Sequence, residues 1–288
     1  MVSTRVDSEC WIPPSGVDDL YKATSGNKFA GINRPTAGAR GEKVLPVGTA
    51  PVQLYSLATP NGQKVSILFE ELEELGCPFS YDAHFVNIGE GEQFLSGFVD
   101  INPNSKIPAC IDQEGPSGKA VKLFESGSIC LYFAEKYGKF IPENLAARAA
   151  MMNWLFWQMG SQGPMTGQFG HFFVYAPAEQ KQARDYGVAR YGMEAQRLCD
   201  VLNRQLSDRQ FLLGDDYSLA DIMIFPWFRQ LSHGYRHGSG LFAKEFLGVE
   251  KYENALRWSE RVEARPAVGR GLRVCNFRES EKGSKPWL

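Results

Sequence analysis

The sequence predicts an α/β domain followed by an all-helical domain, and two features of the hydrophobic pattern indicate this division. Residues 51–137 alternate between short apolar runs with the period of a strand and longer segments with the period of a helix. From residue 145 onward the strand pattern disappears, and apolar residues recur only at helical spacing. At 288 residues, the chain is long enough for two domains with a substantial core.

The first part of the α/β domain is predicted to be a strand–helix–strand unit. Val52–Leu57 is a short apolar run typical of a buried strand, and Phe79–Val86 alternates as a second strand. Between them apolar residues follow helical spacing, and Gly76 is placed to end that helix. These apolar residues are Val65, Leu68, Leu72 and Leu75.

The second part is predicted to be a hairpin closed by a helix. After a short helix around Gln93–Val99, strands are expected at Ala109–Asp112 and Val121–Phe124, joined by the polar loop "QEGPSGK". A further helix follows at Ser126–Tyr137. This order of elements predicts a four-stranded mixed sheet in the thioredoxin-like arrangement.

The rest of the chain is predicted to be helical. We expect an extended N-terminal arm over 1–50, the thioredoxin-like domain over 51–137, a linker over 138–144, an all-helical domain over 145–275 and a tail over 276–288. Helices are expected at about 146–159, 179–206, 218–231 and 250–264. Ser218 and Asp221 match a capping box at the start of one of these helices, which is a structural role.

Composition excludes several classes of function. The chain is 43% hydrophobic and 22% charged with a formal net charge of −2, as in a soluble globular protein with no basic surface for nucleic acid or an anionic membrane. No apolar run approaches the ~20 residues of a membrane-spanning helix. The first residues lack the apolar core of a secretion signal, so we expect a cytoplasmic protein.

The six cysteines are scattered and include no C-x-x-C pair. This spacing disfavours both a metal site of the zinc type and a thioredoxin-type dithiol. Cys110 and Cys130 lie in apolar surroundings and are expected to be buried free thiols. If the protein carries out thiol chemistry, the reacting thiol is therefore expected to come from a ligand.

The turn Thr59–Gly62 lies where the first strand ends and the first helix begins. A helix N-terminus offers unpaired N–H groups and the positive end of the helix dipole, and both stabilise an anion such as a thiolate. The hydroxyl of Thr59 and the amide of Asn61 add donors. From the residues alone an equally good interpretation is that Pro60, Asn61 and Gly62 turn the chain while Thr59 caps the helix.

Two more turns are expected at the same edge of the sheet. Pro108 opens the third strand and is a candidate for a cis bond, which would turn the backbone of Ile107 toward a peptide ligand; a trans proline at an edge strand is the simpler interpretation. Glu125 and Ser126 start the last helix of the domain. Ser126 is expected to cap that helix, and the pair is also suited to an amino-acid head group. Together the three turns indicate a peptide site more strongly than any one alone.

At these residues the chain resembles the glutathione transferases. The segments "NPNSKIPA" and "LFESGSICLYFAEKYG" are similar to the cis-proline and Glu-Ser motifs with which that family binds glutathione. The segment "YSLATPNGQKVSILFEEL" is similar to the nu-class or Ure2-like branch. The likeness runs from about Phe29 to Val274 and includes "MNWLFW" and "ADIMIFPWF". It implies the glutathione transferase architecture and a homodimer.

The resemblance further implies glutathione as the co-substrate, with no metal, and assigns parts of the peptide to the turns. Thr59 and Asn61, on either side of Pro60, would hold the sulfur. Lys106 and Ile107 would bind the glycyl carboxylate and the cysteinyl backbone.

Glu125 and Ser126 would bind the γ-glutamyl end of the peptide. Members of this branch hold two glutathione molecules per site, and Asn33, Gln93 and Arg190 match the positions expected to contact them. The guanidinium of Arg190 is suited to a second carboxylate, which it can bind with two parallel hydrogen bonds.

One departure from the branch concerns the residues after "MNWLFW". Relatives have an apolar residue followed by Gln, whereas this chain has Gln158 followed by Met159. A shift of one residue turns a helical side chain by about 100°, so we expect Gln158 to miss the pocket and Met159 to line it. His171 and Tyr175 are further candidates for the cleft, but packing at the domain interface is the favoured interpretation.

The function implied by the resemblance is a glutathione-dependent reductase of small disulfides, with weak conjugating activity. A conjugating transferase or a hydroperoxide reductase would use the same thiolate and is the alternative among enzymes. A glutathione-binding regulatory protein without turnover is the alternative from another class. The chain lacks an Asn/Gln-rich low-complexity arm, which slightly disfavours the regulator.

Overall fold

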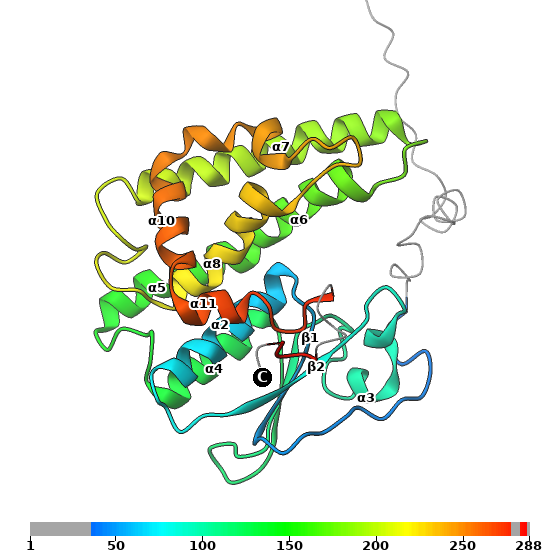
Figure 1. Cartoon of the computed structure of the whole chain (residues 1–288), viewed down its shortest axis with the longest axis vertical. Coiled ribbons are helices and arrows are strands. Elements are labelled where there is room, and N and C mark those ends of the chain that lie inside the picture. Colours follow the sequence, from blue (N-terminus) through cyan, green and yellow to red (C-terminus); the bar gives the residue numbers. More distant parts are fainter. Residues whose placement is uncertain (1–35, 278–282, 287–288) are drawn as a thin grey trace, which may run out of the picture. The chain divides into compact units, whose positions relative to one another are not determined.

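The computed structural model describes residues 36–277 and 283–286, which form a small mixed sheet and a set of helices (Figure 1). The strands are β1 (Val52–Ser56), β2 (Tyr81–Phe85), β3 (Ala109–Asp112) and β4 (Val121–Phe124). Their order is β2-β1-β3-β4; β1 and β2 are parallel, and the other two pairings are antiparallel. The predicted four-stranded mixed sheet is confirmed. Asn33 and residues 1–35 of the expected arm lie outside the described residues.

Each face of the sheet has its own apolar core, because successive side chains of a strand point to opposite faces. Val52 and Leu54 of β1 belong to the core that includes α2 (Pro60–Glu74) and α4 (Ser126–Tyr137). Tyr55 of β1 belongs instead to a smaller core with Phe98 of α3 (Ser96–Val99). The 3-10 turn η1 (Glu92–Phe94) precedes α3.

The described part of the N-terminal arm, residues 36–50, lies along η1 and α3. The N–H of Arg40 donates to the carbonyl of Phe94 (2.7 Å), and the carbonyl of Lys43 accepts from the N–H of Gly97 (3.0 Å). Leu45 packs against the core formed with Tyr55. These contacts tie the arm to the face of the sheet opposite α2 and α4.

The helical domain follows α4. Its elements are α5 (Leu145–Trp157), η2 (Gln158–Gln162), α6 (Gly163–Gly170), η3 (His171–Tyr175), α7 (Lys181–Gln205), α8 (Leu219–Arg229), η4 (Gln230–Gly234), α9 (Ala243–Leu247), η5 (Val249–Lys251), α10 (Glu253–Glu263) and α11 (Pro266–Gly271). The segments η2, η3 and η4 are π turns, and η5 is a 3-10 turn.

The helix was expected to end at about residue 159 and the next one to begin at about 179; for residues 160–175, which are helical, this expectation is wrong. The chain continues through η2 into α6, and Pro164 lies in the first turn of α6. The π turn of η2 lets the chain stay helical through Gly160, Gly163 and Pro164, which resemble a break in the sequence. The short helices α9 and α11 were also not predicted.

The predicted capping box at the start of α8 is confirmed. A carboxylate oxygen of Asp221 accepts from the backbone N–H and the hydroxyl of Ser218, each at 2.9 Å. The other oxygen accepts from Leu212 N–H (3.0 Å) and from the indole of Trp258 (2.8 Å). Burial raises the pKa of Asp221, and these four donors make it a structural anchor of the helical domain.

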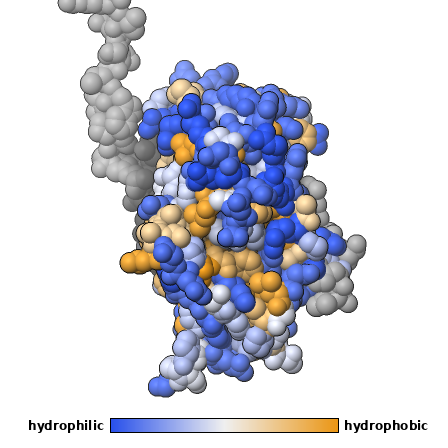
Figure 2. Space-filling model, turned by 90° about the vertical axis from the view of Figure 1, so that its left-hand side faces the viewer, coloured by the Kyte–Doolittle hydropathy of each residue, from blue (hydrophilic) through white to orange (hydrophobic). Residues whose placement is uncertain are grey.

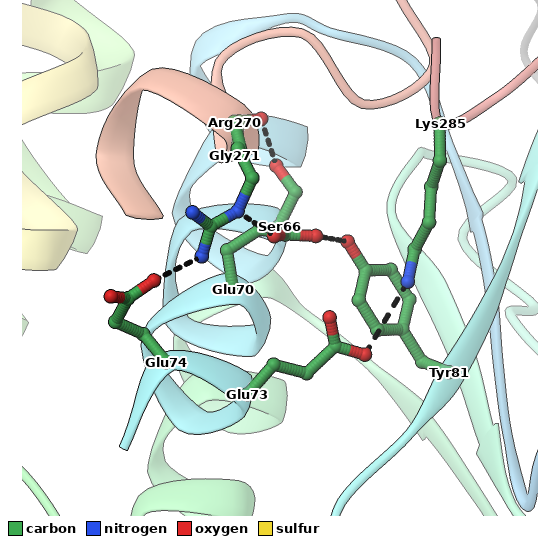
Figure 3. A network of polar contacts seen from close by, with 8 residues as sticks. All are labelled: Ser66, Glu70, Glu73, Glu74, Tyr81, Arg270, Gly271 and Lys285. Atoms are coloured by element: carbon green, nitrogen blue, oxygen red, sulfur yellow. Dashed lines mark hydrogen bonds and ion pairs between the residues drawn. The ribbon is translucent and has the colours of Figure 1, made fainter. Parts of the chain in front are cut away.

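The C-terminal segment packs against α2 (Figure 3). The carbonyl of Gly271 accepts a hydrogen bond from the hydroxyl of Ser66 (2.7 Å). The guanidinium of Arg270 contacts Glu70 (2.7 Å) and Glu74 (2.6 Å), which lie one turn apart on α2. Other side chains of this network are Glu73, Tyr81 and Lys285. Helix α2 is therefore held by the sheet on one side and by the end of the chain on another.

No helix within residues 36–277 or 283–286 is long and apolar enough to cross a membrane.

Candidate active site

The register of the sheet brings the three predicted turns to one edge. Tyr55 pairs with Ala109, and Ala109 pairs with Phe124, so the end of β1, the start of β3 and the end of β4 are neighbours. The turns at Thr59, Pro108 and Glu125 each continue from one of these positions. The structure thus places all three turns side by side.

Thr59 precedes α2 with an extended backbone, and its hydroxyl makes no capping hydrogen bond. The interpretation that Thr59 caps the helix through its side chain is therefore wrong. Pro60 has no N–H, so the first N–H groups of α2 that lack a partner within the helix are those of Asn61 and Gly62. The turn offers an anion the free hydroxyl of Thr59 and the N-terminus of a helix of 15 residues.

The turn is held in place from behind. A Cβ at Gly62 would lie 2.0 Å from the carbonyl oxygen of Leu57, so only glycine allows the helix start to approach the end of β1 this closely. The N–H of Ala58 donates to the carbonyl of Cys275 (3.1 Å), and the amide of Gln63 donates to the carbonyl of Leu272 (3.3 Å). The C-terminal segment thus fixes the residues on both sides of Thr59.

Asn61 contacts the helical domain. The indole N–H of Trp227 on α8 donates to Oδ1 of Asn61 (2.9 Å). Since the oxygen of the amide is engaged as an acceptor, Nδ2 is the atom left to donate to a ligand. Trp227 is nearly buried, and sequence reasoning missed it because 166 residues separate it from Asn61.

The Ile107–Pro108 peptide bond is cis, as the resemblance implied and contrary to the simpler interpretation. The pairing of β3 begins at Ala109, so the backbone of Ile107 precedes the ladder. Asn102 holds this turn through a hydrogen bond from its amide to the carbonyl of Lys106 (2.6 Å). The side chain of Lys106 is exposed.

Ser126 does not cap α4, contrary to the sequence prediction. The capping position is Glu125, which has φ of 66°, and Ser126 is the first residue of the helix. Glu125 is exposed, whereas Ser126 is buried at 3% exposure. The hydroxyl of Ser126 accepts from the ammonium of Lys64 (3.2 Å) and points its own proton toward Sδ of Met159 (3.8 Å).

Gln158 and Met159 both lie against this part of the site. The ammonium of Lys64 donates to Oε1 of Gln158 (2.5 Å) and approaches Sδ of Met159 (3.5 Å). Gln158 is fully buried, while Met159 packs over Gly127, where an added Cβ would lie 3.1 Å from its sulfur. Met159 therefore lies over the start of α4, and Gln158 contacts the ammonium of Lys64. The expectation that Met159 lines the ligand pocket while Gln158 misses it stays a prediction.

Lys64 was missed in the sequence, although a signal was present. It lies four and eight residues before Leu68 and Leu72, on the apolar stripe of α2. A lysine at such a position is buried with the helix unless it turns away to solvent. Here it is 1% exposed.

Four of the five described cysteines are poorly suited to nucleophilic chemistry. Cys110 and Cys130 are fully buried free thiols, as predicted. Burial raises the pKa of Cys130 to about 12 and that of Cys110 well above its usual value, so neither is a thiolate at neutral pH. Burial also raises the pKa of Cys199 and Cys275 to about 12.

The remaining predicted residues lie as follows. Gln93 is 3% exposed, and its Oε1 is buried without a hydrogen-bond partner within the described residues. Arg190 lies exposed on α7. His171 and Tyr175 make ring contacts with Phe172 and Tyr235 of the helical domain, and their expected packing at the domain interface stays a prediction.

Within residues 36–277 and 283–286, no group of three or more His, Cys, Asp or Glu side chains could hold a metal ion. What the site offers instead is a set of donors. A hydroxyl, two backbone N–H groups and an amide at the Thr59 turn suit an anion, and Ser126 backed by Lys64 suits a second one. The fold and these turns define a two-domain protein of the thioredoxin-like type with hydrogen-bond donors gathered at one edge of its sheet.

The comparisons with known proteins agree with this class. The family models of the glutathione S-transferase N-terminal and C-terminal domains match residues 50–135 and 185–261. The chain is 49% identical over 258 residues to the disulfide-bond oxidoreductase YghU of Escherichia coli. The aligned region covers 89% of this chain and 85% of that protein. The chain belongs to the glutathione transferase family.

Two solved structures are similar over most of the chain. Glutathione transferase YghU from Streptococcus pneumoniae, complexed with glutathione, is 45% identical with a TM-score of 0.83 and covers 92% of this chain and 97% of that one. A glutathione transferase from Burkholderia graminis, with two glutathione molecules bound per subunit, is 44% identical with a TM-score of 0.70. It covers 77% of this chain and 88% of that one.

Proposed function

We propose that the protein is a glutathione-dependent reductase of small disulfides and that the reacting thiolate belongs to bound glutathione. The observation that carries this proposal is the uncapped Thr59 at the N-terminus of α2. Cys110 and Cys130 are buried and protonated, so neither supplies a thiolate. The name of the E. coli relative, a disulfide-bond oxidoreductase, supports the reaction type. The glutathione bound in the S. pneumoniae structure supports the co-substrate.

The proposed binding mode uses the three turns. Thr59 and Asn61, with Pro60 between them, contact the sulfur. Ile107, before Pro108, pairs with the cysteinyl backbone, and Lys106 contacts the glycyl carboxylate.

The γ-glutamyl end lies at Glu125 and Ser126 in this binding mode. A second glutathione, as in the B. graminis structure, is proposed to contact Arg190, Gln93 and Asn33. The proposed division of the chain is the one expected from the sequence, with the thioredoxin-like domain at 51–137 and the helical domain at 145–275.

The proposed mechanism is two successive thiol–disulfide exchanges. The thiolate of the first glutathione attacks one sulfur of the substrate disulfide, which forms a mixed disulfide and releases one substrate thiolate. The thiolate of the second glutathione attacks the glutathione sulfur of the mixed disulfide. Glutathione disulfide and the second substrate thiolate leave, and both substrate thiolates take protons from solvent. Two glutathiones held in one site make the second exchange effectively intramolecular.

Replacement of Thr59 tests the assignment of the sulfur site. Hydrogen bonds to charged groups contribute about 1.5–3 kcal/mol, so Thr59→Ala is expected to lower kcat/KM for hydroxyethyl disulfide by roughly tenfold or more. Glutathione affinity should fall less, because the other two turns remain. Thr49→Ala, an exposed threonine before β1, is the matched control and should keep the wild-type rate. An unchanged kcat/KM in Thr59→Ala would count against the assignment.

A variant without cysteines tests whether a protein thiol takes part. With all six cysteines replaced by alanine, we expect kcat to stay within about twofold of wild type at a temperature where the variant is folded. Circular dichroism establishes folding, and the hydroxyethyl disulfide assay gives kcat. Loss of turnover in the folded variant would contradict the mechanism.

The alternatives are separated by the substrate that is turned over. Cumene hydroperoxide and chlorodinitrobenzene report the hydroperoxide reductase and the conjugating transferase. If the protein binds glutathione but turns over neither of these substrates nor hydroxyethyl disulfide, the regulatory protein is favoured.

We also propose a homodimer formed through the outer face of α5. Leu145, Ala149, Met152 and Phe156 follow one stripe of this helix, and Leu145 and Phe156 are 81% and 69% exposed. Apolar residues also gather on the face shown in Figure 2. An apolar stripe with large exposed side chains at Leu145 and Phe156 is typical of a subunit interface.

Sedimentation analysis is expected to give the mass of two chains, because the α5 stripe would be buried between them. Phe156→Glu places a charge in the stripe and is expected to give the mass of one chain. Tyr186→Glu, at an exposed position of α7, is the control and should stay dimeric. A wild-type protein with the mass of one chain would contradict the dimer.

A further inference from the structure

Lys64 is a buried cation next to the proposed site. It lies on α2 with 1% exposure, and its ammonium contacts Ser126 of α4 and both Gln158 and Met159 of η2. These three partners are neutral, and no carboxylate of the described residues forms an ion pair with Lys64. A buried charge without an ion-pair partner in contact is unfavourable, so the folded protein bears a cost that an anionic ligand can offset.

The contact with Lys64 determines whether the hydroxyl of Ser126 donates or accepts a hydrogen bond toward a ligand. An ammonium has three N–H donors and no acceptor, so the Ser126 oxygen must accept from it. The Ser126 proton is then directed elsewhere, at present to the sulfur of Met159 at 3.8 Å, which is a weak acceptor. A carboxylate is a far stronger acceptor for the same proton. Lys64 therefore presents Ser126 as a donor to an anion.

The titratable groups around Lys64 are few. They are Glu125, which precedes α4, and Cys130 of α4, whose thiol is protonated at neutral pH. Gln158 and Met159 of η2 carry no charge. Burial lowers the pKa of Lys64 to about 7, against the smaller raising effect of the Glu125 carboxylate. The ammonium is thus close to losing its proton in the absence of an anion.

We propose that Lys64 is a positioning residue for the α-carboxylate of the γ-glutamyl end of glutathione. Its ammonium fixes Ser126 as a hydrogen-bond donor to this carboxylate and supplies a buried positive charge that attracts it. The inference rests on the proposed function, in which Ser126 binds that end of the peptide. It adds a residue that does not touch the reacting sulfur.

A pH dependence follows from this arrangement. A carboxylate beside Ser126 favours the ammonium form, so binding raises the pKa of Lys64 and takes up a proton above about pH 7. Affinity for a ligand with the carboxylate should therefore be highest below pH 7 and fall as the pH rises through the pKa of the free protein. A ligand without the carboxylate should not show this decrease.

The test compares S-methylglutathione with its analogue that lacks the γ-glutamyl α-carboxylate, by isothermal titration of the full chain. S-methylation removes the titration of the ligand thiol. The preference for the carboxylate is the ratio of the two affinities, S-methylglutathione over its analogue. In the wild type this ratio is expected to fall about tenfold between about pH 6.5 and 8.5. In Lys64→Met, the preference at pH 6.5 should be lower by about tenfold and independent of pH. A merely structural role of Lys64 would weaken both ligands equally.

Lys122→Met is the matched control, because it removes an exposed lysine of β4 that pairs with Asp100. Its preference and pH dependence should equal those of the wild type. Proton uptake by the wild type, measured in two buffers of different ionisation enthalpy, needs no variant and covers the case in which Lys64→Met does not fold.

Wild-type binding without proton uptake, or equal preference in the wild type and Lys64→Met, overturns the inference and leaves the proposed function standing. A wild type that binds neither ligand overturns the proposed function, and the inference with it.

Discussion

Gly62→Ala is expected to abolish most of the activity. The added Cβ would lie 2.0 Å from the carbonyl oxygen of Leu57 and 2.6 Å from Oγ of Ser56, so the helix start must move away from the end of β1. This movement displaces Thr59 and the free N–H groups of the turn. Misplacement of a reacting group by about 1 Å can cost roughly 100-fold in rate, and we expect a loss of about this size in kcat/KM. The overpacking should also destabilise the fold by about 1–3 kcal/mol.

The control for this variant is Gly269→Ala. Gly269 lies on α11, which packs against α2, but no atom lies within 4 Å of a Cβ added there. The activity of Gly269→Ala should equal that of the wild type, and its stability should be unchanged or higher by up to about 1 kcal/mol. Steady-state kinetics and urea unfolding measure both effects. Wild-type kcat/KM in a folded Gly62→Ala protein would show that the position of the turn does not set the rate.

Arg265→Met is expected to destabilise the fold strongly. Arg265 binds Glu71 of α2 through two hydrogen bonds, of 2.6 and 2.8 Å, and its guanidinium lies 4.0 Å from the ring centre of Tyr217. The side chain of Glu71 is 1% exposed, so loss of Arg265 leaves a buried carboxylate unpaired. Removing one partner of a buried pair costs about 3–5 kcal/mol, and we expect roughly 3 kcal/mol because Arg265 itself is 34% exposed.

A double variant separates this cause from simple loss of packing. In Glu71→Met with Arg265→Met no charge is left unpaired, so most of the lost stability should return. Arg204→Met removes an exposed partner of Asp200 and should leave the urea midpoint unchanged. If the double variant is as unstable as Arg265→Met, the buried charge is not the cause.

Most of the sheet domain could be predicted because its signals are local. The hairpin strands Ala109–Asp112 and Val121–Phe124 and the helix Ser126–Tyr137 have the predicted limits. The helical state of residues 160–175 could not be predicted, because Gly160 and Pro164 resemble a break in the sequence and a π turn keeps the chain helical there.

The three turns of the site could be predicted from the sequence, but the contacts among its side chains could not. Ser126 was expected to cap α4, yet the left-handed backbone of Glu125 moves the capping position by one residue. Lys64 and Trp227 were missed because their partners lie far away in the sequence: 94 residues separate Lys64 from Gln158. Such contacts between domains arise from tertiary packing, which the local pattern does not encode.

The central claim is that the Thr59 turn ionises the thiol of bound glutathione, and the ultraviolet absorption of the thiolate tests it most directly. Titration of the protein–glutathione complex with pH should show about tenfold more thiolate at neutral pH than free glutathione contains. In Thr59→Ala most of this excess should be lost while glutathione remains bound. A wild-type complex in which the bound thiol titrates like free glutathione would contradict the claim.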